Sequence, residues 1–193
     1  HIYIPIYNNN FFHSHSSGLK INKIWDKLKK PPLINFSNTE LKLCNKILLK
    51  MGINKNDWFV TLHVREGSTK VDFKSESFRN GNIKDYHKAI KFIVNKGGYV
   101  FRMGDDSLSK LPYIKGVIDY ANSKHKSHAL DIFLGAKSKF CIATSSGYYI
   151  IPYLFGIPIL MTNSLSSLEY WLLRKKDFFL PRIILDKSKN KKL

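Results

Sequence analysis

Three short polar segments of the chain could bind a charged ligand, and each follows a run of apolar residues. They are His63-Val64-Arg65, Arg102-Met103-Gly104-Asp105-Asp106 and Thr144-Ser145-Ser146-Gly147. An arginine suits a diphosphate, because its planar guanidinium can donate two parallel hydrogen bonds. Small hydroxyl residues at a helix start suit phosphate as well, because the first N–H groups of a helix lack partners within it. These segments predict a site for a phosphate-bearing ligand, to which Arg79 could add positive charge.

Each of these residues also has an explanation that needs no ligand. His63 could be a core histidine, and Arg65 could form a surface salt bridge. The Thr144–Gly147 segment could be an ordinary helix N-cap, and Asp106 could cap a helix over residues 107–113. Asp131 could be a solvated acid on a helix. Only their convergence at one place would favour a site over these separate explanations.

The elements that must position these side chains alternate between strand and helix. Apolar and β-branched runs predict strands over residues 58–64, 99–103, 116–120, 139–143 and 157–162; between them, helices are expected over 83–95, 107–113, 128–136 and 147–155. This alternation predicts an α/β fold, a Rossmann-like parallel sheet with helices on both faces. Because the carboxyl ends of parallel strands share one edge, the three polar segments should meet there.

The first part of the chain looks different. Residues 1–37 are rich in turn formers and are expected to be irregular, and His13 and His15 are interpreted as loop residues rather than metal ligands. Asn38 or Thr39 is expected to cap a helix that Gly52 ends. We therefore divide the chain into residues 1–55, an irregular segment with a linker helix, and residues 56–193, the α/β domain.

Composition narrows the class of protein. With 193 residues, 44% hydrophobic and 24% charged, the chain is globular rather than disordered. The longest apolar stretch, Tyr148–Met161, is shorter than the ~20 residues of a membrane-spanning helix. Cys44 and Cys141 have no CxxC neighbour and are expected to be reduced core thiols, which favours a cytoplasmic setting.

The formal net charge of +18 attracts polyanions, so a nucleic-acid-binding domain is one alternative. Its basic runs, however, are scattered rather than interleaved with aromatic residues along one face, and we expect no nucleic-acid partner. The segment Tyr170–Lys176 with the lysine-rich tail could contact the inner face of a membrane peripherally, or it could pack by its tryptophan face with its lysines in water.

Taken in order, the polar segments resemble the donor-binding domain of fucosyltransferase-like glycosyltransferases, which have two facing Rossmann-like domains (the GT-B arrangement). The resemblance covers roughly Trp58 to Asn163. It consists of a strand ending in His-x-Arg, a strand ending in Asp-Asp, an aspartate-bearing helix and a Ser-Ser turn. Other residues resemble more closely a bacterial group of glycosyltransferases linked to polysaccharide synthesis, namely Arg79-Asn80, Tyr86, Arg102-Met103-Gly104, Ile118-Asp119-Tyr120-Ala121 and Thr162-Asn163.

The resemblance implies a role for each candidate residue. Arg65 would bind the β-phosphate of a nucleoside diphosphate sugar, His63 would lie beside the ribose or phosphate, and Asp131 would recognise the base. The other donor-binding candidates are Arg79, Arg102, Asp105, Asp106, Thr144, Ser145, Ser146 and Gly147. Arg65 would also stabilise the leaving diphosphate. The general base is left open among Glu66, Asp72 and Glu76.

The resemblance further implies an inverting transferase that needs no metal and no cofactor beyond its donor, with GDP-fucose as the template. The acceptor would be a glycan, a polysaccharide or a lipid-linked sugar, and residues 1–55 would be the tail of an N-terminal domain missing from this sequence. A heptosyltransferase-like or sulfotransferase-like enzyme and a non-enzymatic adaptor on the same fold are the remaining alternatives.

Overall fold

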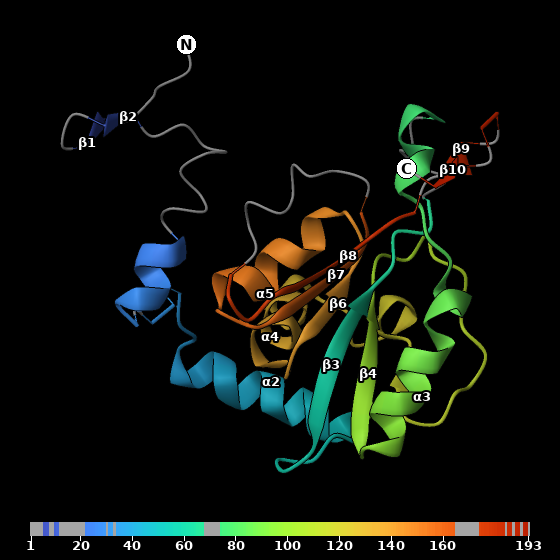
Figure 1. Cartoon of the computed structure of the whole chain (residues 1–193). Helices are drawn as coiled ribbons and strands as arrows, with labels where there is room; N and C mark the ends of the chain where they lie inside the picture. The colour runs from blue at the N-terminus through green and yellow to red at the C-terminus, as the bar shows by residue number, and fades with distance from the viewer. Residues whose placement is uncertain are drawn as a thin grey trace.

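The structure of the protein is a computed structural model (Figure 1). It describes residues 6–7, 10–11, 22–29, 31–32, 34–67, 74–164, 174–183, 185–186, 188–189 and 191–192. The predictions for His13, His15, Asp72 and residues 170–173 lie outside these ranges.

A six-stranded sheet with all neighbours parallel forms the centre of the molecule. Its strands are β3 (Trp58–His63), β4 (Gly98–Met103), β5 (Val117–Ile118), β6 (Cys141–Ala143), β7 (Ile159–Ser164) and β8 (Phe178–Pro181). Their order across the sheet is β5-β4-β3-β6-β7-β8. The chain runs from the central strand β3 through β4 to β5 at one edge. It then crosses back to β6, beside β3, and continues through β7 to β8 at the other edge, which is the Rossmann order. The predicted fold class is confirmed.

Helices cover both faces of this sheet (Figure 1). Helix α3 (His87–Asn95), preceded by the 3₁₀ turns η1 (Lys74–Arg79) and η2 (Ile83–Tyr86), packs on the face that holds Val60, Leu62 and Val100. The opposite face is covered by α2 (Asn38–Lys50), α4 (His128–Lys137) and α5 (Ile150–Leu154), the last continuing the turn η4 (Gly147–Tyr149). A further 3₁₀ turn, η3 (Tyr120–Asn122), follows β5.

Two small antiparallel ribbons lie outside the main sheet. They pair β1 (Ile6–Tyr7) with β2 (Asn10–Phe11) and β9 (Leu185–Asp186) with β10 (Lys191–Lys192). Within the described parts of the first segment, residues 22–27 are helical, so the prediction that residues 1–37 are irregular is wrong there. Helix α2 begins one residue earlier than predicted, because Ser37 and Glu40 form a reciprocal capping box. It ends at Lys50, and Gly52, the predicted stop, follows the C-cap Met51 with a left-handed φ of 83°.

The predicted helix over residues 107–113 does not form. Backbone groups of this segment are bound by side chains instead: the Arg102 guanidinium donates to the Ser109 carbonyl at 2.7 Å, and the Asp119 carboxylate accepts from the Leu111 N–H at 3.0 Å. Asp106 therefore caps no helix.

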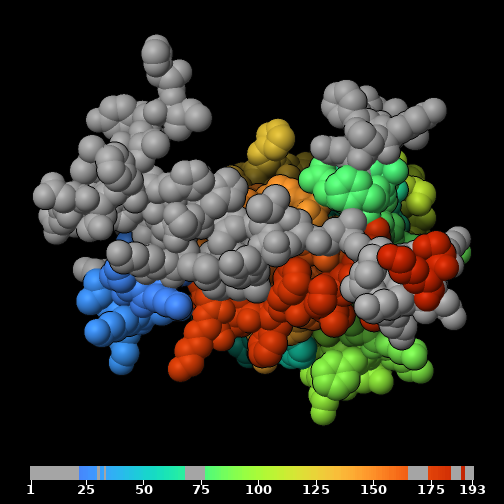
Figure 2. Space-filling model, turned by 45° about the horizontal axis from the view of Figure 1, so that its top comes forward, coloured from blue at the N-terminus to red at the C-terminus, as the bar shows by residue number. Residues whose placement is uncertain are grey.

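Strand β8 was not predicted, because its apolar run Phe178-Phe179-Leu180 is short and ends at Pro181. Figure 2 shows residues 174–183 in red on the outer surface, between residues 22–29 in blue and residues 74–95 in green.

Candidate functional site

Two neighbouring cavities open at the carboxyl ends of β3 and β4. One, of about 160 Å³, is lined by His63, Val64, Arg65, Glu66, Gly67, Gly104, Asp105, Ser107, Leu108 and Ser146. The other, of about 430 Å³, shares four of these residues and adds Gly81, Asn82 and Ser109. In this strand order the chain changes direction between β3 and β6, and ligands of open α/β sheets bind beyond the carboxyl ends at that point. The smaller cavity lies there, between Arg65 and Ser146.

The backbone around Arg65 is fixed from two sides. Its N–H donates to the Thr144 hydroxyl at 2.9 Å, and its carbonyl accepts from the Gly81 N–H at 2.7 Å. The Thr144 N–H in turn donates to the His63 carbonyl at 3.0 Å. Thr144 is fully buried, so it positions Arg65 rather than contacting a ligand itself. The guanidinium of Arg65 is thus carried on a rigid backbone at the cavity wall.

The Ser-Ser-Gly segment splits into a buried and an accessible part. Ser145 is buried, whereas Ser146 lines the smaller cavity. Ser146 directly precedes η4, but its side chain makes no hydrogen bond to the helix start. Gly147 is exposed and has open space where a Cβ would stand, so a ligand can approach the backbone there. Of the predicted phosphate-binding hydroxyls, Ser146 is the one at the cavity.

His63 is held as a neutral imidazole. Burial lowers its pKa to about 4, against its usual value near 6.5. Its ring stacks on Tyr148, with centroids 5.3 Å apart and planes at 16°. The buried Nδ1 atom has no hydrogen-bond partner among the described residues. At neutral pH, His63 can therefore exchange a hydrogen bond with a ligand at the cavity but contributes no charge toward a phosphate.

The buried neutral state of His63 predicts a specific acid sensitivity. Below the ordinary histidine pKa the unfolded chain binds a proton at His63, but the folded chain does not until about pH 4. The contribution of His63 to the free energy of unfolding is therefore fully present above pH 6.5. It falls by about 3 kcal/mol as the pH drops toward 4. The free energy of unfolding, measured with urea, should fall between pH 7 and pH 4 by about 3 kcal/mol less in a His63→Phe variant than in the wild type. Equal losses in both proteins would contradict the assignment.

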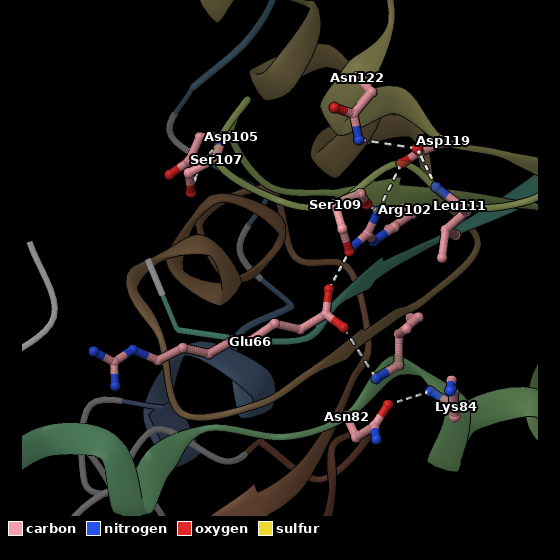
Figure 3. A network of polar contacts seen from close by, with 12 residues as sticks. Glu66, Asn82, Lys84, Arg102, Asp105, Ser107, Ser109, Leu111, Asp119 and Asn122 are labelled. Atoms are coloured by element: carbon pink, nitrogen blue, oxygen red, sulfur yellow. Dashed lines mark hydrogen bonds and ion pairs between the residues drawn. The ribbon is translucent and has the colours of Figure 1, made fainter. Parts of the chain in front are cut away.

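A charge network centred on Arg102 includes Glu66, which lines both cavities (Figure 3). Arg102 is 1% exposed and forms ion pairs with Glu66 and Asp119, the latter at 3.1 Å. The second Glu66 oxygen accepts from the Ile83 N–H at 3.2 Å. Asp119 also accepts from Asn122 at 2.9 Å. Arg102 thus joins the ends of β3 and β4 to the loop 104–119, and its guanidinium lies within the protein rather than on the cavity wall.

The remaining predicted residues divide between the site and its surroundings. Asp105 lines the smaller cavity, and its carboxylate accepts from the Ser107 N–H at 2.9 Å and from the Ser107 hydroxyl. Asp106 is exposed. Asp131 lies in the first turn of α4 and pairs with Lys126 at 3.0 Å. Arg79 ends η1, half-buried, and lines neither cavity.

One residue near the site was not found by sequence analysis. Arg182 follows β8 and hydrogen-bonds to the segment that carries Gly81, which lines the larger cavity. The strand before it was itself not predicted, so no sequence signal placed Arg182 at this edge.

Among the described residues, no three His, Cys, Asp or Glu side chains gather as around a metal ion, and no helix is long and apolar enough to span a membrane.

Comparisons with known proteins show the fold. No protein-family model and no curated protein matches the chain. A solved structure that does match is a glycosyl transferase of family 9 from Veillonella parvula DSM 2008, with a TM-score of 0.58 and 11% sequence identity. The match covers 77% of this chain and 42% of that one, so the matched part spans less than half the length of the structural neighbour. The neighbour supports the GT-B type of fold and not a fucosyltransferase-like one in particular.

Proposed function

We propose that this chain is the donor-binding half of a glycosyltransferase that uses a nucleoside diphosphate sugar. The observation that carries the proposal is the cavity at the β3–β6 switch point, where Arg65 and Ser146 face it from the two halves of the sheet. That is where a Rossmann-like sheet binds a nucleotide, and both groups suit a diphosphate. The structural neighbour, described as a glycosyl transferase, supports the same class.

In this proposal Arg65 and the helix start act on the diphosphate together. The guanidinium binds the β-phosphate, and Ser146 with the backbone of Gly147 approaches it from the opposite side. As the sugar leaves, negative charge develops on the β-phosphate, and preorganised donors stabilise that charge more than they stabilise the bound donor. The rigid backbone of Arg65 keeps its guanidinium positioned before the reaction begins.

The contacts of Glu66 favour a positioning role over that of general base. Its carboxylate already accepts hydrogen bonds from Arg102 and from the Ile83 backbone, so taking a proton would break the ion pair with a buried guanidinium. We therefore propose that the acceptor hydroxyl is deprotonated by another carboxylate. Asp72, outside the described residues, and Glu76 remain the candidates within this chain.

The finer features of the reaction are carried over as proposals from the sequence resemblance. They are a GDP-fucose-like donor recognised through Asp131, inversion at the sugar carbon without a metal ion, and a glycan or lipid-linked acceptor held by a facing N-terminal domain. A cytoplasmic setting is proposed from the two cysteines, and peripheral membrane contact from the Tyr170–Lys176 segment and the lysine-rich tail.

The proposal is tested by calorimetric titration of the purified chain with GDP, UDP, ADP, CMP and dTDP. We expect one diphosphate to bind selectively, which would also name the base. A DNA oligonucleotide is titrated alongside. Strong binding of the oligonucleotide with no preference among the nucleotides would favour a nucleic-acid-binding domain instead, since that binding depends on the net positive charge.

A further inference from the structure

Two sequence segments with no role in the proposed site, Arg79-Asn80 and Thr162-Asn163, meet at Arg182. Asn80 and Asn163 are 83 residues apart, and the Asn163 amide donates to the Asn80 carbonyl at 3.4 Å. Arg182 bridges both: Nε donates to Asn163 Oδ1 at 2.5 Å, and Nη2 donates to the Asn80 carbonyl at 2.7 Å. Its Nη1 donates to the Phe78 carbonyl. One guanidinium therefore fastens residues 78–80 to the end of β7.

The end of β7 is shaped to present Asn163. Asn163 has a φ of 56°, in the left-handed region where asparagine is one of the few tolerated residues. Its neighbour Thr162 shares a 2.7 Å hydrogen bond with the Tyr86 hydroxyl. The Arg182 N–H donates to the Ser164 carbonyl at 3.0 Å, which anchors the arginine to the same strand. Arg182 is thus fixed at its backbone before it reaches across.

The fastened segment leads directly to Arg65. Gly81 follows Asn80, and its N–H donates to the Arg65 carbonyl at 2.7 Å. Gly81 is closely packed, since a Cβ there would stand 3.1 Å from Val64 and 3.2 Å from Asn163. Gly81 and Asn82 also line the larger cavity. Any movement of residues 78–81 therefore displaces the backbone from which the Arg65 side chain extends.

We propose that Arg182 is a positioning residue that acts through residues 78–81 to hold Arg65 against the β-phosphate. This inference rests on the proposed function, because it assigns Arg182 to the phosphate-binding step at that site. The Asn163 side-chain oxygen accepts the Nε hydrogen bond of Arg182 and so helps to hold the guanidinium against residues 78–80.

The test is a double-mutant cycle on nucleotide affinity. Arg182→Ala should weaken binding of the preferred nucleoside diphosphate about tenfold and leave the monophosphate, which lacks the β-phosphate, unchanged. In an Arg65→Ala background the same substitution should have no further effect, because coupled residues are not additive. Lys175→Ala, which removes an exposed charge elsewhere, serves as the control and should not alter affinity. Equal losses for both nucleotides, or full additivity with Arg65→Ala, would overturn the proposal.

A second pair of variants keeps the test informative if Arg182→Ala folds poorly. Asn163→Gly suits the left-handed backbone but removes the Arg182 acceptor, and should weaken diphosphate binding in the same way. Asn163→Asp keeps an oxygen for Arg182 and should retain affinity. Equal affinities of these two variants would overturn the proposal.

The contact can also be examined without any nucleotide. Hydrogen exchange at the Gly81 amide should be faster in Arg182→Ala than in the wild type, because the bond to the Arg65 carbonyl loosens. Unchanged exchange would overturn the positioning role. If no diphosphate binds the wild type but exchange accelerates, the proposed function fails, while the coupling of Arg182 through residues 78–81 to the Arg65 backbone stands.

Discussion

Replacing Arg65 by alanine should weaken binding of the preferred nucleoside diphosphate about a hundredfold. A bidentate guanidinium–phosphate contact supplies two charge-assisted hydrogen bonds, together worth about 3 kcal/mol at a partly enclosed site. The contacts to Thr144 and Gly81 use only main-chain atoms of Arg65, so the substitution leaves them in place. The loss should appear in the affinity measured by calorimetry.

Two further variants identify the cause of that loss. Arg65→Lys keeps the charge but not the planar fork, and should recover only part of the affinity. Lys84→Ala, at an exposed position nearby, removes one positive charge and should have little effect. If Lys84→Ala weakened binding as much as Arg65→Ala, the attraction would come from net charge rather than from a phosphate site at Arg65.

Replacing Arg102 by methionine should lower the free energy of unfolding by about 3 kcal/mol. The side chain is 1% exposed and neutralises Glu66 and Asp119, which are themselves 18% and 19% exposed. Removing one partner of a buried ion pair leaves uncompensated charge in a poorly solvated place. The melting temperature should fall by about 10 °C, as measured by circular dichroism.

The control for Arg102→Met is Lys110→Met, a change of the same kind at an exposed residue of the adjoining loop. It should leave the melting temperature nearly unchanged. In addition, Asp119→Asn should cost less in the Arg102→Met background than in the wild type, because its partner is already gone. Equal melting temperatures for Arg102→Met and Lys110→Met would show that the network carries little stability.

Much of the fold could be predicted from the sequence, because buried parallel strands give continuous apolar runs. The strands over residues 58–64 and 99–103 were found within a residue or two of their bounds. The helix over residues 107–113 was wrongly predicted, because helical spacing within the segment cannot show that Arg102 and Asp119, which lie outside it, bind its backbone groups. The missed strand β8 has a similar cause: its position depends on pairing with β7.

The candidate site was predictable in outline but not in the roles of its arginines. A parallel sheet brings residues after β3, β4 and β6 to one edge, so the meeting of Arg65, Asp105 and Ser146 follows from topology. Whether an arginine at that edge faces a cavity or a carboxylate depends on three-dimensional neighbours. Arg102 was expected to bind the donor, yet its hydrogen bonds go to Glu66, Asp119 and Ser109. The identity of the nucleotide and the role of each residue toward it stay predictions.

The most direct test of the central claim is a crystal structure of the chain with its preferred nucleoside diphosphate. We expect the diphosphate to lie in the cavity between the ends of β3 and β6, with the β-phosphate against the Arg65 guanidinium and Ser146. A nucleotide bound elsewhere would contradict the proposed site. One such place is the cavity of about 450 Å³ lined by Trp25, Tyr153 and Lys176.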